Sequence, residues 1–268
     1  MHVSNKAEVE VSYDVSNEFF RLWLDERMNY TCGVFDDTEN LEKAQVQKLA
    51  FLHDYAKCGP DTKSVLDIGC GWGANIEYLA VDRKIPDVHG ITLSTAQHEE
   101  IKRRKIAGVT SHCVSYADYQ PPAGTKFDAL FSICMMEHIA TPDEARTGKH
   151  LDLYRNFFRL CREWTRPGAY FALQTILRNV VPRNRKDLED IGFCTYKIFP
   201  GGISLRMEDI VMSVTPYFEI IEVTTRRIDY MKTSEHWLAR LRRNEKLIRD
   251  KWGNQVFEDY DRYLSTCV

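Results

Sequence analysis

The sequence lacks any long apolar run and any excess of charge of one sign. No segment approaches the ~18 consecutive apolar residues of a membrane-spanning helix. Thirty-six Lys and Arg residues against 39 Asp and Glu give a formal net charge of −3 over 268 residues. The absence of a long apolar run argues against membrane insertion. The absence of excess positive charge argues against a nucleic-acid partner, because proteins that bind nucleic acid usually have a basic surface. We expect a soluble, cytoplasmic protein.

The eight cysteines are scattered along the chain and form no CxxC pair. Paired spacing is typical of zinc sites and of small disulfide-bonded scaffolds. We therefore expect no metal site, and thiols that stay reduced, as is usual in cytoplasm. A hydrophobic content of 44% lets a chain of this length bury the core of one large α/β domain.

β-Branched and aromatic runs alternate with helical segments, which predicts an α/β fold with a mostly parallel twisted sheet and helices on both faces. The expected strands are 64–68, 88–92, 109–113, 127–134, 169–176 and 218–224. The expected helices include 74–82, 95–107 after an N-cap at Ser94, and 150–164. A C-terminal helix is expected to bury Trp237, Leu238 and Leu241 and to leave a solvated basic face, made of Arg240, Arg242, Arg243 and Lys246.

The most informative motif is the run VLDIGCGWG at 65–73. It reads as a buried strand ending in a turn where Gly69, Gly71 and Gly73 leave room for a ligand beside a helix N-terminus. It is not the GxGxxG dinucleotide fingerprint, and its acid, Asp67, precedes the glycines. An acid followed by GxGxG resembles the first motif of class I S-adenosylmethionine (SAM) methyltransferases, which have a Rossmann-like fold. A plain tight turn is the alternative.

On this interpretation the chain has four parts. These are an N-terminal helical lid segment at 1–60, a SAM-binding Rossmann-like core at 61–176, a substrate-covering insertion at 177–210, and the end of the core with a C-terminal helix at 211–268. In the first part, Phe19, Phe20 and Trp23 either cover the cofactor or form the core face of an amphipathic helix.

Seven ordered blocks resemble the cyclopropane fatty acid and mycolic acid cyclopropane synthase family of SAM-dependent enzymes, and together they extend over nearly the whole chain. Six are the segments 13–20, 30–35, 66–73, 90–97, 137–138 and 198–202. The seventh is an ordered set near the end of the chain, made of Tyr230, Lys232, Thr233, Trp237, Tyr260 and Tyr263. Plant alkaloid N-methyltransferases and natural-product C-methyltransferases look similar over the same blocks, so the acceptor stays open.

The resemblance implies a SAM site. In the family, the positions of Tyr30 and Thr31 close over the cofactor, and the glycine turn lies against its amino-acid portion. Where many methyltransferases place an acid after the second strand, this chain and the family have none. The implied cofactor-binding residues are Tyr30, Thr31, Asp67, Gly69, Gly71, Thr92, Gln97, Tyr116, Asp118 and Ile133, of which Tyr116 and Asp118 replace a Trp–Glu pair beside the adenine.

Glu137, just after the fourth strand, is the leading catalytic candidate. A carboxylate in a water-poor site favours the sulfonium and a developing carbocation. The alternative is a helix N-terminal acid stabilised by the helix dipole. His138 is either a general base or a residue that starts a helix.

In cyclopropane synthases, several of these positions surround a bicarbonate that takes a proton from the methylated cation. The matching residues here are Cys32, Ile133, Glu137, Gln174 and Tyr230. Gln174 stands where the family has histidine, and an amide can hydrogen-bond an anion but cannot relay a proton. This puts bicarbonate binding and ring closure in question. The rings of Tyr13, Tyr30, Phe35 and Tyr230 are expected to stabilise a transient cation.

Two length differences point to a small hydrophobic acceptor. The stretch 141–148 is longer than the family pattern, and 177–197 is shorter where the family covers a long acyl chain. A basic group there either binds an anionic part of the acceptor or forms a solvated loop, and it comprises Arg178, Arg183, Arg185 and Lys186.

The prediction is therefore a methyltransferase that acts on an electron-rich, alkene-type carbon of a small hydrophobic metabolite. The rivals are cyclopropanation of an unsaturated acyl chain and N-methylation of an amine. A non-catalytic SAM-binding protein is a remote alternative. The sequence is compatible with a homo-oligomer.

Overall fold

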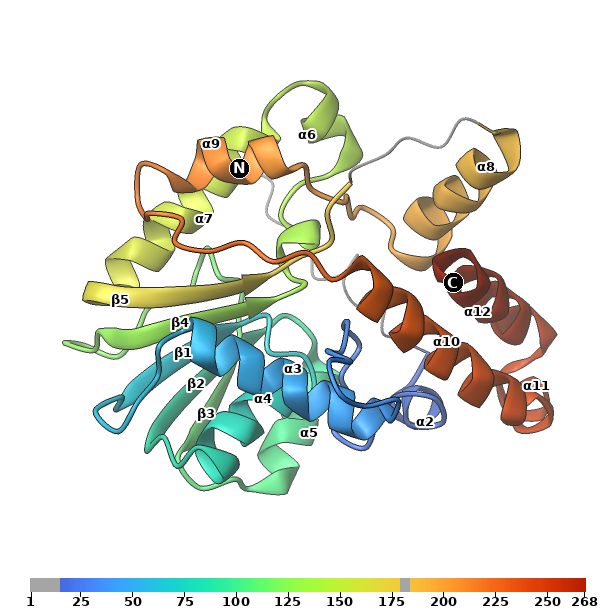
Figure 1. Ribbon diagram of the computed structural model, residues 1–268, viewed down its shortest axis with the longest axis horizontal. Coiled ribbons are helices and arrows are strands. Elements are labelled where there is room, and N and C mark those ends of the chain that lie inside the picture. Colours follow the sequence, from blue (N-terminus) through green and yellow to red (C-terminus); the bar gives the residue numbers. More distant parts are fainter. Residues whose placement is uncertain (1–14, 179–183) are drawn as a thin grey trace. The chain divides into compact units, whose positions relative to one another are not determined.

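The computed structural model describes residues 15–178 and 184–268 (Figure 1). These residues belong to two compact units. The first contains residues 49–178 and 201–223, and the second contains 15–48, 184–200 and 224–268. Tyr13 and Arg183, both named from the sequence, lie outside the described residues.

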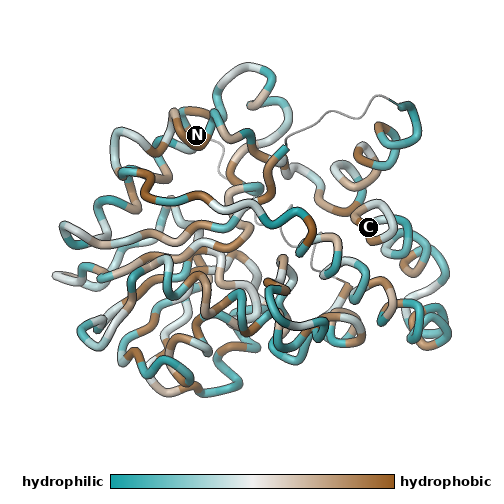
Figure 2. The backbone as a smooth tube through the Cα atoms, in the orientation of Figure 1, coloured by the Kyte–Doolittle hydropathy of each residue, from teal (hydrophilic) through white to brown (hydrophobic). Residues whose placement is uncertain are grey.

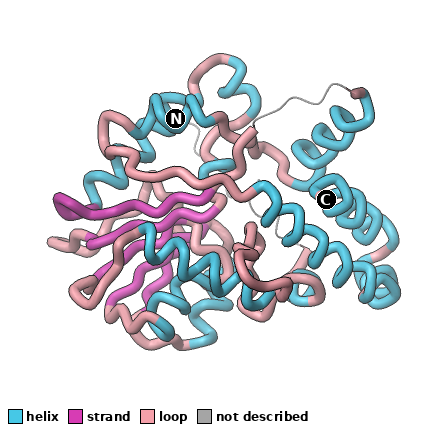
Figure 3. The backbone as a smooth tube through the Cα atoms, viewed as in Figure 1, coloured by secondary structure: helices cyan, strands magenta, loops and turns pink. Residues whose placement is uncertain are grey.

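A five-stranded parallel sheet forms the centre of the first unit, with strand order β3-β2-β1-β4-β5 (Figure 3). The strands are β1 (Ser64–Ile68), β2 (Asp87–Thr92), β3 (Val109–Cys113), β4 (Phe127–Ile133) and β5 (Thr165–Gln174). The strand order reverses between β1 and β4, which is where open α/β sheets bind ligands. The predicted Rossmann-like α/β fold is confirmed.

Successive side chains along a strand point to opposite faces of the sheet, and an apolar core covers each face. On one face, Leu66 and Ile68 pack with residues of α7 (His150–Trp164) and α9 (Met207–Val214). On the other, Val65 packs with residues of α3 (Leu41–Tyr55), α4 (Ala74–Glu77), the π-helical turn η1 (Tyr78–Asp82) and α5 (Thr95–Arg104). The hydrophobic stretches of these elements are visible in Figure 2.

The helix predictions in this unit hold, with small differences at the ends. The segment 74–82 is helical throughout as α4 and η1, and α7 has the predicted bounds. Ser94 caps α5, where its side chain accepts from the Gln97 amide, but the helix ends at Arg104 because Lys105 adopts a left-handed conformation with φ 49°. Two short helices follow β4, η2 (Met136–His138) and α6 (Pro142–Arg146).

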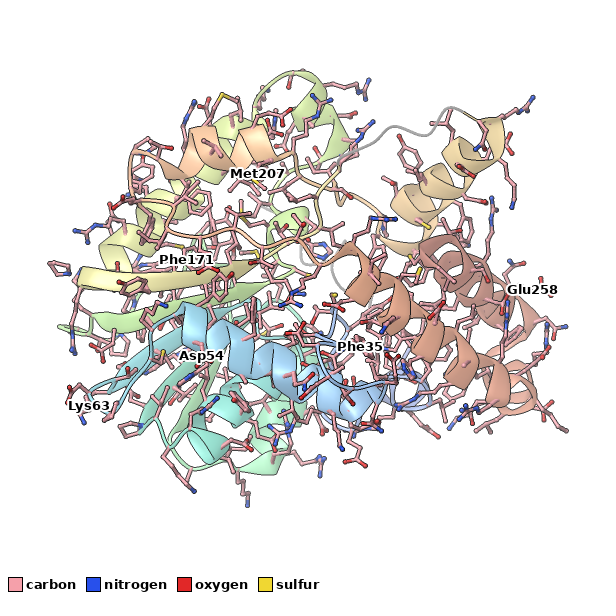
Figure 4. All side chains as sticks on the ribbon, viewed as in Figure 1. Phe35, Asp54, Lys63, Phe171, Met207 and Glu258 are labelled. Atoms are coloured by element: carbon pink, nitrogen blue, oxygen red, sulfur yellow. The ribbon has the colours of Figure 1, made fainter. Side chains whose placement is uncertain are left out.

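The prediction of a strand at 218–224 is wrong, since this segment is an extended loop. The Phe218 ring packs against Phe171 of β5, a residue labelled in Figure 4, and Glu222 accepts a hydrogen bond from the Tyr55 hydroxyl at 2.8 Å. Between these anchors the apolar side chains face outward, and Ile221 is 65% exposed. The β-branched composition indicated a strand, but β-propensity depends on a packed, paired context that this segment lacks.

The second unit is helical in the described residues. Its helices are α2 (Asn17–Arg21), α8 (Arg185–Phe193), the π-helical turn η3 (Cys194–Ile198), α10 (Arg227–Arg243), α11 (Glu245–Trp252) and α12 (Asn254–Cys267). Their shared core is aromatic. Phe19, Phe20 and Trp23 are fully buried and make edge-to-face or tilted contacts with Tyr260. Of the two interpretations left open, Phe19 and Phe20 fit the core face of a helix, while Trp23 reaches the same core from the turn after α2.

Ion pairs join α10 and its N-cap residue Arg226 to the segment before α3 and to the first turn of α3. Arg226 pairs with Asp36, Lys232 with Glu39, and Arg240 with Glu42. The assignment of Arg240 to a solvated face is wrong, because its guanidinium is half-buried and also donates to the Leu24 carbonyl at 2.8 Å. Three other basic side chains of the predicted face are exposed, namely Arg242, Arg243 and Lys246.

All eight cysteines are unpaired thiols, two of them buried. No helix in the described part of the chain is both long enough and apolar enough to cross a membrane. Nor does any group of three or more His, Cys, Asp or Glu side chains within residues 15–178 and 184–268 have the arrangement of a metal site.

Candidate functional site

The glycine turn lies at the carboxyl end of β1, and its three glycines have different surroundings. All three have positive φ. A Cβ at Gly69 would come within 2.6 Å of the Met135 side chain, and one at Gly73 within 2.9 Å of Ile101. A Cβ at Gly71 would meet no described atom within 4 Å. Packing therefore explains two of the glycines, whereas Gly71 leaves the backbone open to a ligand.

Asp67 is a buried carboxylate on β1, and its Oδ2 accepts a hydrogen bond from the Asn75 side chain at 3.1 Å. This contact joins the end of the strand to the start of α4. Asp67 therefore stabilises the turn whose open face Gly71 provides, which is consistent with the cofactor-binding role predicted for it.

Thr92 and Gln97 lie together at the carboxyl end of the neighbouring strand β2. The Thr92 hydroxyl donates to the Gln97 side-chain oxygen at 2.7 Å and accepts from the Ser94 amide at 3.2 Å. Both side chains are about 5% exposed. The pair fixes the turn into α5.

Tyr116 and Asp118 follow β3 but differ in exposure. The Tyr116 ring is 6% exposed and packs edge-on against Phe157 of α7. Burial raises the pKa of its hydroxyl above the usual value. Asp118 is exposed and its amide donates to the Ser115 carbonyl. Asp118 thus has an exposed carboxylate, while Tyr116 contributes its ring to the protein core.

Glu137 lies in η2, directly after β4, and is 8% exposed. Its Oε1 accepts hydrogen bonds from the Thr175 hydroxyl at 3.0 Å and from the Ile176 amide at 2.6 Å. Its backbone carbonyl accepts from the Ile203 amide at 2.9 Å. The residues after β5 therefore fix the carboxyl group. Nothing in the sequence around Thr175 and Ile176 indicates this role.

Burial raises the pKa of Glu137 to about 7, although the hydrogen bonds from Ile176 and Thr175 lower it. The carboxyl group is therefore poised near neutral pH, which is typical of an acid or base that exchanges protons during a reaction. A surface acid at a helix N-terminus would not be buried in this way. Burial also lowers the pKa of the neighbouring His138 to about 4, so its imidazole is neutral at pH 7.

Ile133 and Gln174 are paired residues at the ends of β4 and β5. The Gln174 carbonyl accepts from the Cys134 amide at 2.8 Å. Thr175 and Ile176, which bind Glu137, are the next two residues of the chain. The first unit therefore brings together three of the residues that match the bicarbonate site of cyclopropane synthases, namely Ile133, Glu137 and Gln174.

Tyr30 and Thr31 belong to the second unit. The Tyr30 ring packs with Trp23, Trp237 and other aromatic residues of that unit's core. Thr31 is held by two side chains of α3, since its hydroxyl accepts from Lys48 at 3.1 Å and its carbonyl from Gln45 at 2.8 Å.

Lys48 is 2% exposed, and it also donates to the Asn29 side-chain oxygen at 2.9 Å. Asn29 in turn donates to Asp25 from its backbone and its side chain, at 2.7 and 2.8 Å. This buried network fixes the backbone on both sides of Tyr30. The sequence does not show that Lys48 is buried, so this network could be found only in the structure.

Cys32 and Tyr230, the other two residues that match the bicarbonate site, also lie in the second unit. The Cys32 thiol contacts the Gly33 carbonyl at 3.1 Å, and burial, aided by the charge of Asp229, raises its pKa to about 12. It is therefore a neutral thiol at physiological pH. Tyr230 is half-buried in α10, with its ring edge-on to Trp237.

Two further predicted groups have other contacts. Phe35 is buried and stacks on His236 at 5.7 Å between ring centroids, so one face of its ring is occupied by a protein side chain. In the basic group of 178–186, Arg178 and Lys186 are exposed, and Arg185 pairs with Glu189 on the same helix. Each described member of this group is therefore a solvent-exposed side chain.

The fold and site define a class I methyltransferase-type protein, with a parallel sheet, a glycine turn after β1 and a buried glutamate after β4. The family model described as mycolic acid cyclopropane synthetase matches residues 2–268. The chain belongs to this family, and the resemblance seen in the sequence is confirmed.

Individual relatives agree. The cyclopropane-fatty-acyl-phospholipid synthase of Escherichia coli is 28% identical over 258 residues, covering 96% of this chain and 62% of the relative. The chain thus spans about three fifths of that enzyme's length. Cyclopropane mycolic acid synthase 2 of Mycobacterium leprae is 28% identical over 285 residues, which cover 97% of this chain and 87% of the relative. The crystal structure of mycolic acid cyclopropane synthase CmaA1 complexed with SAH and CTAB matches with a TM-score of 0.87 and 25% identity. The match covers 99% of this chain and 93% of CmaA1.

Proposed function

We propose that this protein is a SAM-dependent methyltransferase whose acceptor is an electron-rich, alkene-type carbon of a small hydrophobic molecule. The observation that carries the proposal is the fixed, buried carboxyl group of Glu137 on the same sheet edge as the open turn at Gly71. Family membership supports SAM as the donor. The SAH and the alkyl-chain ligand CTAB named for the CmaA1 crystal structure support a hydrophobic acceptor.

SAM supplies an activated methyl group when it is bound. Gly71 allows the backbone to approach the donor, and Asp67 with Asn75 keeps the turn in shape. Holding donor and acceptor at reaction distance can contribute roughly 7 to 11 kcal/mol in well-oriented systems. Positioning is therefore expected to be the largest contribution to catalysis.

Glu137 acts once the acceptor carbon has become bonded to the methyl group. The alkene then bears a positive charge, which the carboxylate stabilises in a site from which water is largely excluded. Loss of a proton from a carbon next to the cation restores a double bond, and Glu137 Oε2 is the oxygen available to take that proton. The carboxylate form is needed, so the rate is expected to rise as the pH passes about 7.

The proposal is tested with tritium-labelled SAM and a lipid and terpenoid extract, by measuring the label that enters organic-soluble products. Wild-type protein is expected to transfer label, and Glu137→Gln to lower turnover about tenfold or more while SAM affinity, measured by calorimetry, stays nearly unchanged. Glu163→Gln, which alters an exposed carboxylate on α7, is the matched control. Equal transfer by Glu137→Gln and wild type would remove Glu137 from the mechanism, and no transfer at all would contradict the proposed function.

A further inference from the structure

Arg104, the last residue of α5, is a basic side chain that turns toward the protein. It belongs to the basic run 102–105, in which Lys102, Arg103 and Lys105 are exposed. The Arg104 side chain is only 23% exposed. A basic residue in the last turn of a helix is usually explained by the helix dipole. That explanation applies equally to the exposed members of the run, so it does not account for the direction that Arg104 takes.

The Arg104 guanidinium joins the glycine turn to the helix that follows it. One terminal nitrogen donates to the backbone carbonyl of Trp72, inside the turn, and the other donates to Glu77 Oε2 at 2.5 Å. The Glu77 amide in turn donates to the Gly73 carbonyl at 3.0 Å. A planar guanidinium suits such two-point binding, because its donors are held in a fixed arrangement. Arg104 therefore ties the turn and α4 together.

The face of α5 that carries Arg104 packs closely against the turn. Gln97, Ile101 and Arg104 are spaced four and then three residues apart, so they share one side of the helix. Gln97 accepts from Thr92 at the end of β2. A Cβ at Gly73 would come within 2.9 Å of Ile101 and 2.7 Å of Arg104, so the missing side chain leaves room for this face. One face of α5 therefore supports two neighbouring parts of the predicted SAM site.

We propose that Arg104 is a positioning residue for SAM, which keeps the turn in the conformation that receives the cofactor. Gly69, Gly71 and Gly73 all have positive φ, and glycine is flexible enough to leave such a conformation when nothing holds it. Two charge-assisted donors reduce that freedom in advance, so less order has to be imposed when SAM binds. Arg104 acts through the Trp72 carbonyl. This inference rests on the proposed function, since it takes the glycine turn as part of the SAM site.

The test measures binding of SAM and S-adenosylhomocysteine by calorimetry, together with the KM for SAM and kcat in the tritium assay. Arg104→Met removes the guanidinium and keeps an unbranched side chain for packing. Arg104→Lys keeps the charge but places it on one ammonium group, which cannot reproduce the planar arrangement of donors. Arg103→Met is the matched control, because Arg103 is an exposed arginine of the same helix whose ion pair, with Glu100, lies within α5.

Arg104→Met is expected to weaken binding of both compounds about tenfold and to raise the KM for SAM by a similar factor, while kcat at saturating SAM stays within about twofold of wild type. Arg104→Lys should recover part of the affinity, and Arg103→Met should bind SAM as wild type does. Glu77→Ala removes the other end of the same contact, so its effect and that of Arg104→Met should be less than additive in the double variant.

Unchanged SAM affinity in Arg104→Met, even with a lower melting temperature, would show that the contact is only structural and would overturn the role of Arg104 alone. Equal weakening by Arg103→Met, fully additive effects with Glu77→Ala, or a fall in kcat without a rise in KM would also overturn it. Calorimetry needs no acceptor, so it is separate from methyl transfer. Weakened SAM binding by Arg104→Met, with no label transfer by wild type, overturns the proposed function and supports the role of Arg104.

Discussion

Replacing Glu137 by glutamine should stabilise the protein, and by an amount that grows with pH. Glutamine keeps a side-chain oxygen for the Thr175 and Ile176 donors, but it cannot ionise. The folded protein holds the Glu137 proton with a pKa of about 7, raised by burial from an ordinary 4.5. Ionising this buried side chain therefore costs folding free energy in wild type and nothing in the variant.

Proton linkage determines the direction in which the stability difference changes with pH. The pKa is higher in the folded state, so the native protein binds the proton more tightly than the unfolded chain does. Below about pH 4.5 both states are protonated and the cost is absent. As the pH rises toward and past about 7 the cost grows to ~3 kcal/mol, at about 1.4 kcal/mol for each tenfold difference in proton affinity.

Thermal unfolding at pH 5 and at pH 8.5 tests this reasoning. The melting temperature of Glu137→Gln should exceed that of wild type by roughly 6 to 10 °C at pH 8.5, and by much less at pH 5. Glu163→Gln, an exposed control on α7, should show no comparable pH-dependent gain. A Glu137→Gln protein that is no more stable than wild type at pH 8.5, or whose gain is the same at both pH values, would refute it.

Three further predictions follow from individual contacts. Gly71→Ala should weaken SAM binding in calorimetry about tenfold or more and cost only the strain of a left-handed alanine, about 1 to 2 kcal/mol. Gly73→Ala should lower the melting temperature further, because its Cβ would also clash with the protein, and the reverse pattern would contradict the assignment of the open turn. Gln174→His restores an imidazole next to the Glu137 site, and an increase in cyclopropane-containing product by mass spectrometry is expected, while an unchanged product ratio would show that the missing imidazole does not decide the outcome. Lys48→Met should cost about 3 to 5 kcal/mol in urea unfolding, because it leaves the Asp25 carboxylate buried without its nearby cation, and a loss below about 1 kcal/mol would argue against the network.

The sheet and its main helices could be predicted because their signals are local. Strand β1, the turn at Gly69 to Gly73 and the Ser94 cap are each contained in a few consecutive residues. The segment 218–224 was mispredicted because its β-branched composition is also local, whereas pairing depends on a partner strand that the sequence does not specify.

The candidate site was only partly accessible from the sequence. Glu137 was found because it follows a strand, but the groups that fix it, Thr175 and Ile176, come from a different strand end. Arg240 was misassigned for the same reason, since its partner Glu42 is almost 200 residues away.

The central claim is methyl transfer to an alkene-type carbon, and mass spectrometry of products made with trideuteromethyl SAM tests it most directly. The account predicts a product that retains all three deuterium atoms, because the proton removed by Glu137 comes from the acceptor and not from the new methyl group. A product with only two deuterium atoms would contradict this account and identify the reaction as cyclopropane formation, in which a proton is lost from the transferred methyl group.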